Sequence, residues 1–199
     1  MNDKFKIIII SVLLTILVIF GIYKLADGGK FVPNEFVEAR LGASVVADNI
    51  VKMSNESLKS LEKISQDETK RNYESAISAV SSELEKNKQA RQEAIKLSNY
   101  LDQMAKSLSD IKPRRARDLA TEAVGEEISV INHLIYYNDH LNQLLELLKA
   151  KFEGKIKNRE DRLKELIQLI NQEANSINKL NQRFNSAMQE FDSLTLIAN

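Results

Sequence analysis

Apolar residues recur at steps of three and four along most of the chain beyond residue 34, which is the spacing of amphipathic helices. In the first such segment the expected core stripe includes Phe36, Leu41 and Ile50. The last segment has the cleanest repeat, with apolar residues at every seventh position: Ile156, Leu163, Ile170, Ile177, Phe184, Phe191 and Ala198. This repeat is typical of helices that pack almost parallel to one another. The pattern predicts helices over 34–64, 67–111, 113–153 and 156–197.

The breaks between these helices are marked by residues that begin or end helices. We expect Asn34 to cap the first helix, Pro113 to stop one helix or open the next, and Gly154 to cap the third. The first break is marked less sharply. Residues 65–68 have the spacing of a capping box, but no glycine or proline enforces a turn there. A single helix over 34–111 is therefore the alternative.

These segments predict an all-α fold in which residues 34–199 form an elongated antiparallel bundle of three or four long, coiled-coil-like helices. A helix of about forty residues is about 60 Å long, and short polar connections force neighbouring helices to run in opposite directions. The bundle has four members if the chain turns near Ser65 and three if it does not. Each buried Leu or Ile contributes roughly 1.5 to 3 kcal/mol, so the apolar stripes can offset the entropy of ordering such helices.

The first thirty residues have a different pattern. A short tail over 1–6 precedes an uncharged, apolar run over 7–23, which as a helix is about 25 Å long, close to the lower limit for crossing a bilayer. We expect this run to be a transmembrane signal anchor. A linker over 24–33 follows, and its glycines and Pro33 separate the anchor from the bundle. A cleaved signal peptide with its processing site at 26–28 is the alternative.

The expected location follows from this anchor. We expect a single-pass protein of the cell membrane, with its N-terminus in the cytoplasm and the bundle extracytoplasmic. Positive charges flank the apolar run almost equally on both sides, so the short N-terminal tail is the feature that favours this orientation.

Composition and charge narrow the classes of function. The chain has no cysteine, which excludes disulfides, thiolate metal sites and thiol catalysis. It has 28 basic and 28 acidic residues, so no overall field draws it to nucleic acid, and we expect no nucleic-acid partner. Phosphate-binding glycine loops and the motifs of serine hydrolases and zinc peptidases do not occur in the sequence. We therefore expect a protein that is not an enzyme and needs no cofactor.

The two histidines, His133 and His140, are the only candidates for metal or acid–base chemistry. On a helix they share a face with Glu126 and Tyr137, which together offer a carboxylate, two imidazoles and a phenol. The seven-residue spacing places the imidazoles about 10 Å apart, too far for one ion to bridge. The Glu-x-x-His pairs typical of metal sites in bundles do not occur. We therefore expect a polar seam or a solvated face, with no catalytic and no metal-binding residue.

A basic stretch lies where the second and third predicted helices meet: Lys112, Arg114, Arg115 and Arg117. In a four-helix bundle the second helix returns towards the anchor, and these side chains then face the bilayer, where each gains about 1 kcal/mol beside anionic lipids. In a three-helix bundle they lie at the far tip, where they suit an acidic partner protein. The simplest interpretation is a solvated loop.

The last predicted helix is rich in asparagine. Its members are Asn171, Asn175, Asn178, Asn181 and Asn185. We interpret them as an uncharged solvent face. The alternative is that some cross the bundle, where a buried asparagine fixes the register of the helices at a cost in stability.

Together these features favour a non-enzymatic, membrane-anchored bundle that acts as a scaffold, adaptor or tether at the cell envelope. The expected partners are the lipid bilayer and a protein, either a different one or a second copy of the chain, bound through the helix faces. One alternative is a bundle that binds or senses a ligand and relays the signal to membrane partners. A membrane-perturbing or pore-forming helical protein is the other.

Overall fold

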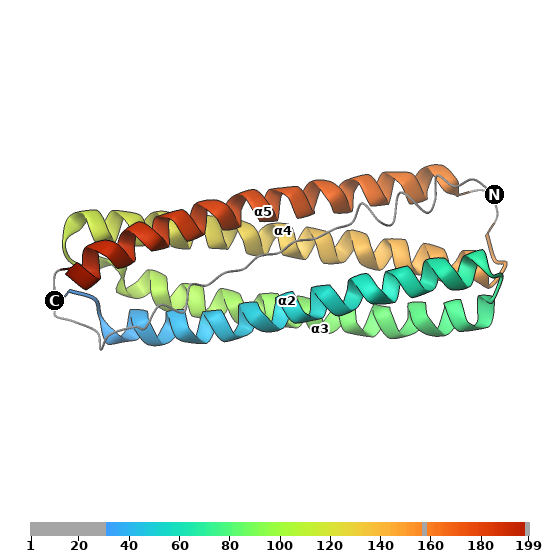
Figure 1. Ribbon diagram of the computed structural model, residues 1–199, viewed down its shortest axis with the longest axis horizontal. Coiled ribbons are helices and arrows are strands. Elements are labelled where there is room, and N and C mark those ends of the chain that lie inside the picture. Colours follow the sequence, from blue (N-terminus) through green and yellow to red (C-terminus); the bar gives the residue numbers. More distant parts are fainter. Residues whose placement is uncertain (1–30, 157–158, 198–199) are drawn as a thin grey trace.

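The computed structural model describes residues 31–156 and 159–197, which form a four-helix antiparallel bundle (Figure 1). The bundle helices are α2 (Asn34–Thr69), α3 (Tyr73–Ser107), α4 (Arg114–Phe152) and α5 (Glu160–Ile197), and a short 3-10 helix, η1 (Leu108–Asp110), follows α3. With 35 to 39 residues each, the four helices are about 53 to 58 Å long. The prediction of an all-α, antiparallel bundle of long helices is confirmed, and it has four members.

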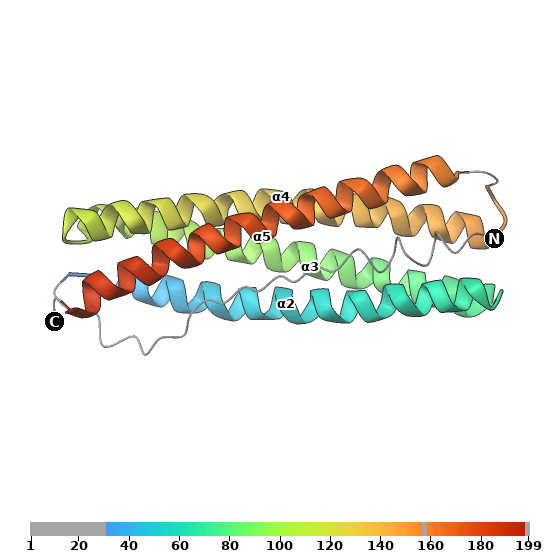
Figure 2. The same ribbon diagram turned by 45° about the horizontal axis from the view of Figure 1, so that its top comes forward.

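The helices pack in the order of the chain, α2 on α3, α3 on α4 and α4 on α5. Figures 1 and 2 show α2 beside α3 and α4 beside α5 in both views. The fourth side of the bundle, between α2 and α5, is packed much less closely along its length than the other three. The α5 helix is therefore held in place chiefly by α4.

The turn between α2 and α3 lies beyond the predicted break, because α2 continues through the capping-box sequence at 65–68 to Thr69. Arg71 ends the helix in a left-handed conformation, with φ of 60°. The backbone N–H groups of Arg71 and Asn72 donate to the carbonyls of Glu68 and Asp67 at 3.0 and 2.9 Å, which is a Schellman motif. The predicted helix end at 64 was wrong, and the single helix over 34–111 does not occur.

The other helix boundaries follow the glycine and proline signals more closely. Gly154, with φ of 71°, ends α4 in a second Schellman motif, as predicted. Pro113 stands at the N-cap position of α4. Pro33, and not Asn34, takes the same position in α2. The α5 helix begins at Glu160 and not at 156.

The bundle core contains most of the predicted apolar stripe. In α5 the seven-residue repeat is buried as expected, from Leu163 to Phe191. In α2, Phe36 and Ile50 are buried but Leu41 is 44% exposed, so its assignment to the core was wrong. The interior side of α2 is lined instead by small residues: Ala39, Ala43 and Ala47. Small side chains let α3 approach closely, and a Cβ on Gly42 would lie 2.2 Å from Cε1 of Tyr100.

A charged pair and an aromatic pair join α2 to α5. The guanidinium of Arg40 donates to both carboxylate oxygens of Asp192, at 2.6 and 2.8 Å, and the two side chains are only 7% and 13% exposed. The rings of Phe36 and Phe191 lie beside this pair, with their centroids 5.6 Å apart. We call these four residues the clasp.

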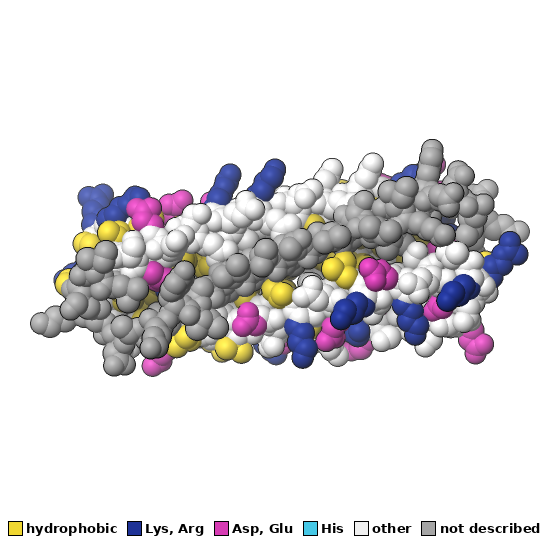
Figure 3. Space-filling model, in the orientation of Figure 1, with side chains coloured by type: hydrophobic (Ala, Val, Ile, Leu, Met, Phe, Trp, Pro, Cys, Tyr) yellow, Lys and Arg dark blue, Asp and Glu magenta, His cyan; other side chains and the backbone are white. Residues whose placement is uncertain are grey.

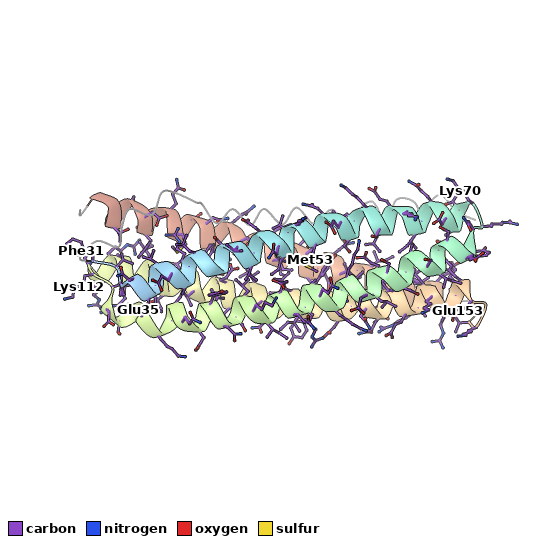
Figure 4. All side chains as sticks on the ribbon, turned by 90° about the horizontal axis from the view of Figure 1, so that it is seen from below. Phe31, Glu35, Met53, Lys70, Lys112 and Glu153 are labelled. Atoms are coloured by element: carbon purple, nitrogen blue, oxygen red, sulfur yellow. The ribbon has the colours of Figure 1, made fainter. Side chains whose placement is uncertain are left out.

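The antiparallel topology gives the bundle two distinct ends. Phe31, Glu35 and Lys112 lie at one end, whereas Lys70 and Glu153 lie at the other (Figure 4). We call the first the entry end, because the chain enters the bundle there, and the second the distal end. The N–H of Lys112 donates to the carbonyl of Phe31 at 2.8 Å, which fixes the entering chain against the connection between α3 and α4.

The predicted anchor over 7–23 and the linker up to residue 30 lie outside the described residues. Among the helices of 31–156 and 159–197, none is long and apolar enough to cross a membrane.

Candidate functional site

The predicted basic stretch lies at the entry end, as a four-helix bundle requires. Lys112 is exposed in the connection before α4, and Arg114, Arg115 and Arg117 lie in the first turn of that helix. Cations at a helix N-terminus lie at the positive end of the helix dipole, so their own helix does not stabilise them. The charges must therefore be balanced by other side chains or by solvent.

Carboxylates of α4 and α5 balance part of this charge. Glu190 accepts hydrogen bonds from Nε and Nη2 of Arg115 at 3.1 and 2.6 Å, and this bonded carboxylate raises the pKa of the Arg115 guanidinium. Asp118 lies 3.9 Å from Nε of Arg114, and both side chains are well exposed. Arg117 donates weakly, at 3.5 Å, to the carbonyl of Ser109. The stretch therefore presents less net positive charge than its sequence indicates.

A shallow groove of about 490 Å³ runs between α4 and α5 near this end. Arg115, Lys179 and Arg183 line it together with Glu122 and Glu190. The groove thus combines three cations with two carboxylates, so it has no strong preference for an anionic or a cationic ligand. On the face shown in Figure 3, Lys and Arg are likewise interspersed with Asp and Glu over the described helices.

The two histidines are not brought together. Nδ1 of His133 lies 2.6 Å from Oε2 of Glu173 on α5. The carboxylate of Glu126 lies 3.6 Å from the guanidinium of Arg183, which is also on α5. Tyr137 points into the core, where burial and the charge of Glu83 raise its pKa. The Glu126, His133 and Tyr137 side chains therefore serve separate contacts. His133 belongs to a polar seam between α4 and α5, as predicted.

The bundle interior contains several polar groups, and the apolar pattern of the sequence did not indicate the carboxyl groups among them. Ser57 donates to Glu83, and Nδ2 of Asn87 donates to the carbonyl of Asn138 at 2.8 Å. Glu127 is 1% exposed, and neither of its carboxylate oxygens has a hydrogen-bond partner within the described part of the chain. Burial raises the pKa of Glu127 to about 8, and no neighbouring charge contributes. At neutral pH this carboxyl group therefore keeps its proton.

One of the five asparagines of α5 is fully inside the bundle. Asn181 is 3% exposed, and both polar atoms of its side chain lack partners among residues 31–156 and 159–197. Oδ1 of Asn178 is also buried and unpaired there. The alternative interpretation, in which some asparagines cross the bundle, therefore holds for Asn181, while Asn175 is exposed.

Within residues 31–156 and 159–197, no cluster of three or more His, Cys, Asp or Glu side chains is arranged to hold a metal ion. A scan against models of protein families and searches of curated proteins and of solved structures find no match to this chain. Proposals about function therefore rest on the geometry of the bundle.

Proposed function

We propose that the protein is a non-enzymatic, membrane-anchored tether or scaffold of the cell envelope, with the N-terminus in the cytoplasm and the bundle outside it. The observation that carries this proposal is the arrangement of the two ends of the bundle along its long axis. The apolar run at 7–23 precedes the entry end by only a short linker, and the α2–α3 and α4–α5 turns lie at the distal end, about 55 Å away. An anchored bundle of this form holds its distal turns at a set distance from the bilayer.

Its basic side chains support a role for the entry end as the surface nearest the membrane. Lys112, Arg114 and Arg117 are not tied to a carboxylate as closely as Arg115 is to Glu190. Each cation near an anionic surface contributes about 1 kcal/mol. Three such residues orient an anchored protein, although they are too few to recruit it without an anchor.

The distal end and the helix faces are the proposed contact surfaces for a partner protein or a second copy. Tyr73 is exposed at the distal end and stacks on Phe152, with their ring centroids 6.0 Å apart. Exposed aromatic residues on a rigid scaffold are typical anchors of protein interfaces.

The first test is the location of the bundle. We would place a tag after α5 and treat intact cells with protease, using a cytoplasmic protein as the control. Digestion of the tag alone supports the proposal. Protection of the tag contradicts the extracytoplasmic orientation and would make a tether on the cytoplasmic side the better hypothesis.

The second test is the orientation of the bundle on a membrane. Because the chain has no cysteine, Glu35→Cys and Lys70→Cys each provide one labelling site, at the entry and distal ends. We expect a lipid-borne quencher to quench a fluorophore at Glu35→Cys strongly and one at Lys70→Cys weakly, in vesicles that contain the full chain. Equal quenching would mean that the bundle lies flat on the bilayer, which contradicts a tether.

A further inference from the structure

The interface between α4 and α5 contains unpaired polar groups in its buried layer. Glu127 on α4 and Asn181 on α5 are both at least nine-tenths buried, and none of their four side-chain polar atoms has a partner among the described residues. An unpaired buried polar group costs on the order of 1 to 3 kcal/mol. Such a cost in the middle of a long apolar seam marks this layer as its weak point.

Two cross-helix pairs show that these groups share one level of the bundle. Arg183 reaches Glu126 at 3.6 Å, and Glu173 reaches His133 at 2.6 Å. Asn178 and Asn181 lie between Glu173 and Arg183 on α5, just as Glu127 lies between Glu126 and His133 on α4. The unpaired side chains of the two helices therefore lie at the same level of the bundle.

The charged groups around this layer are engaged elsewhere or exposed. On α4 and α5 they are the two pairs just described and Lys179, which lies between Asn178 and Asn181 and is exposed. The nearest charged residues on α3 bond within that helix, Lys96 to Glu93 and Lys106 to Asp102, and on α2 the buried Arg40 is bound to Asp192. None of these residues affects the pKa of Glu127, which burial alone raises. Nothing around the layer compensates a negative charge at this position.

A protonated carboxyl group can remain in a buried layer, but a carboxylate cannot do so without water or a cation. Opening the interface between α4 and α5 is the simplest way to hydrate it. The α5 helix is the element whose displacement disturbs the other interfaces least, because it packs chiefly on α4 and is joined to α2 mainly through the clasp at the entry end.

We propose that α5 is a proton-gated helix, whose middle separates from the bundle when Glu127 loses its proton, while the clasp retains its C-terminal part. Opening exposes the apolar repeat of α5 and the facing stripe of α4. This inference does not depend on the membrane anchor or on the orientation of the bundle.

The experiment measures the position of α5 directly. Spin labels at Asn99→Cys on α3 and Asn175→Cys on α5 report the distance across the weak layer, in the full chain held in detergent micelles. Both positions are exposed, and the chain has no native cysteine. Labels at Asn99→Cys and Asn132→Cys, on α3 and α4, form the control pair. Pulsed electron paramagnetic resonance at pH 6 and pH 9 gives both distance distributions.

We expect the α3–α5 distances to become longer and broader at pH 9, with a midpoint near pH 8, while the α3–α4 distances stay unchanged. Glu127→Gln, a neutral side chain of the same shape, should abolish the change. Glu122→Gln, at an exposed position on the same helix, should retain it. Glu127→Met gives a second test in case the glutamine variant is poorly folded, and it should also stay closed at pH 9.

Three results would overturn the proposal. The first is an α3–α5 distribution that is the same at both pH values in the wild-type chain. The second is an opening that persists unchanged in Glu127→Gln or Glu127→Met, which would assign the effect to a group other than Glu127. The third is an equal change in the control pair, which would indicate general loosening of the bundle.

Discussion

Asp192→Asn should destabilise the bundle far more than an ordinary surface substitution. It keeps the shape of the side chain but removes the negative charge that faces Arg40 in the clasp. Arg40 and Asp192 are 7% and 13% exposed and are joined by two hydrogen bonds, at 2.6 and 2.8 Å. Removal of one partner leaves the other as an uncompensated, buried charge, which typically costs 3 to 5 kcal/mol.

The residual exposure of the clasp places the expected loss at the lower end of this range, at about 3 kcal/mol. For a chain of this size, 1 kcal/mol corresponds to a change in melting temperature of about 2 to 4 °C. Asp192→Asn should therefore lower the melting temperature by roughly 6 to 12 °C. Denaturation in urea, followed by circular dichroism of the full chain in micelles, measures the free energy itself.

The pair of Arg91 and Asp139 provides a matched control. It also joins two helices, but its side chains are 48% and 42% exposed. Because exposed ion pairs contribute about 0 to 1 kcal/mol, Asp139→Asn should change stability by less than 1 kcal/mol.

A double-mutant cycle with Arg40→Met and Asp192→Leu isolates the coupling in the clasp. We expect the double variant to be close to the wild type in stability, because an apolar pair replaces a buried ionic one. If Asp192→Asn and Asp139→Asn had equal effects, or if the coupling were below about 0.5 kcal/mol, the account of the clasp as a buried ion pair would be refuted.

Three further predictions concern the interface between α4 and α5. The pKa of Glu127 rises from 4.5 to about 8 on folding, so between these pH values the folded state holds a proton that the unfolded state has lost. The free energy of unfolding should therefore fall as pH increases through this interval, by roughly 4 to 5 kcal/mol at most. Urea midpoints between pH 5 and pH 9 should show this fall in the wild type and not in Glu127→Gln. Ile177→Asp places a charge at a fully buried position and should abolish cooperative melting. Unchanged melting would contradict the placement of the seven-residue repeat of α5 in the core. His133→Ala should lower stability by less than about 1 kcal/mol near pH 7.5, because its bond to Glu173 is partly exposed, and a larger loss in the same melting assay would contradict this.

The sequence was most informative where one side-chain type recurs at a fixed spacing. The seven-residue repeat of α5 identified the buried face of that helix from Leu163 to Phe191, and the glycine at 154 identified the end of α4. The turn after α2 was harder to find, because Arg71 adopts the left-handed conformation that usually favours glycine. The position of this turn depends on backbone hydrogen bonds, which the residue types at the turn do not predict.

The unpaired layer was missed because neighbouring residues satisfy helical spacing equally well. Between Val124 and Ile131, either Glu127 or Ile128 continues the stripe, and hydrophobicity favours the isoleucine. In the structure Ile128 is 46% exposed and Glu127 is buried. The crossing angle and rotation of packed helices decide such cases, and the spacing within a single helix does not contain them.

The pattern of apolar residues also could not predict which side chains pair between helices. His133 and Glu173 are forty positions apart, and Arg40 and Asp192 are 152 apart. Charged residues of both signs occur on every helix, so many pairings are compatible with the sequence. The register of the antiparallel helices selects among them, and that register is set by the lengths of the turns and by the core.

The placement of the entry and distal ends has a mechanical consequence. A pull between the entry end of α2 and one of the distal turns acts along the helices, so their interfaces are loaded in shear and many contacts must break together. A pull between the entry end of α2 and the C-terminal part of α5 acts at one end only, so α5 is peeled from α4 one turn at a time. The same bundle therefore resists the first load strongly and gives way gradually to the second. Under the second load the clasp is the first contact to break.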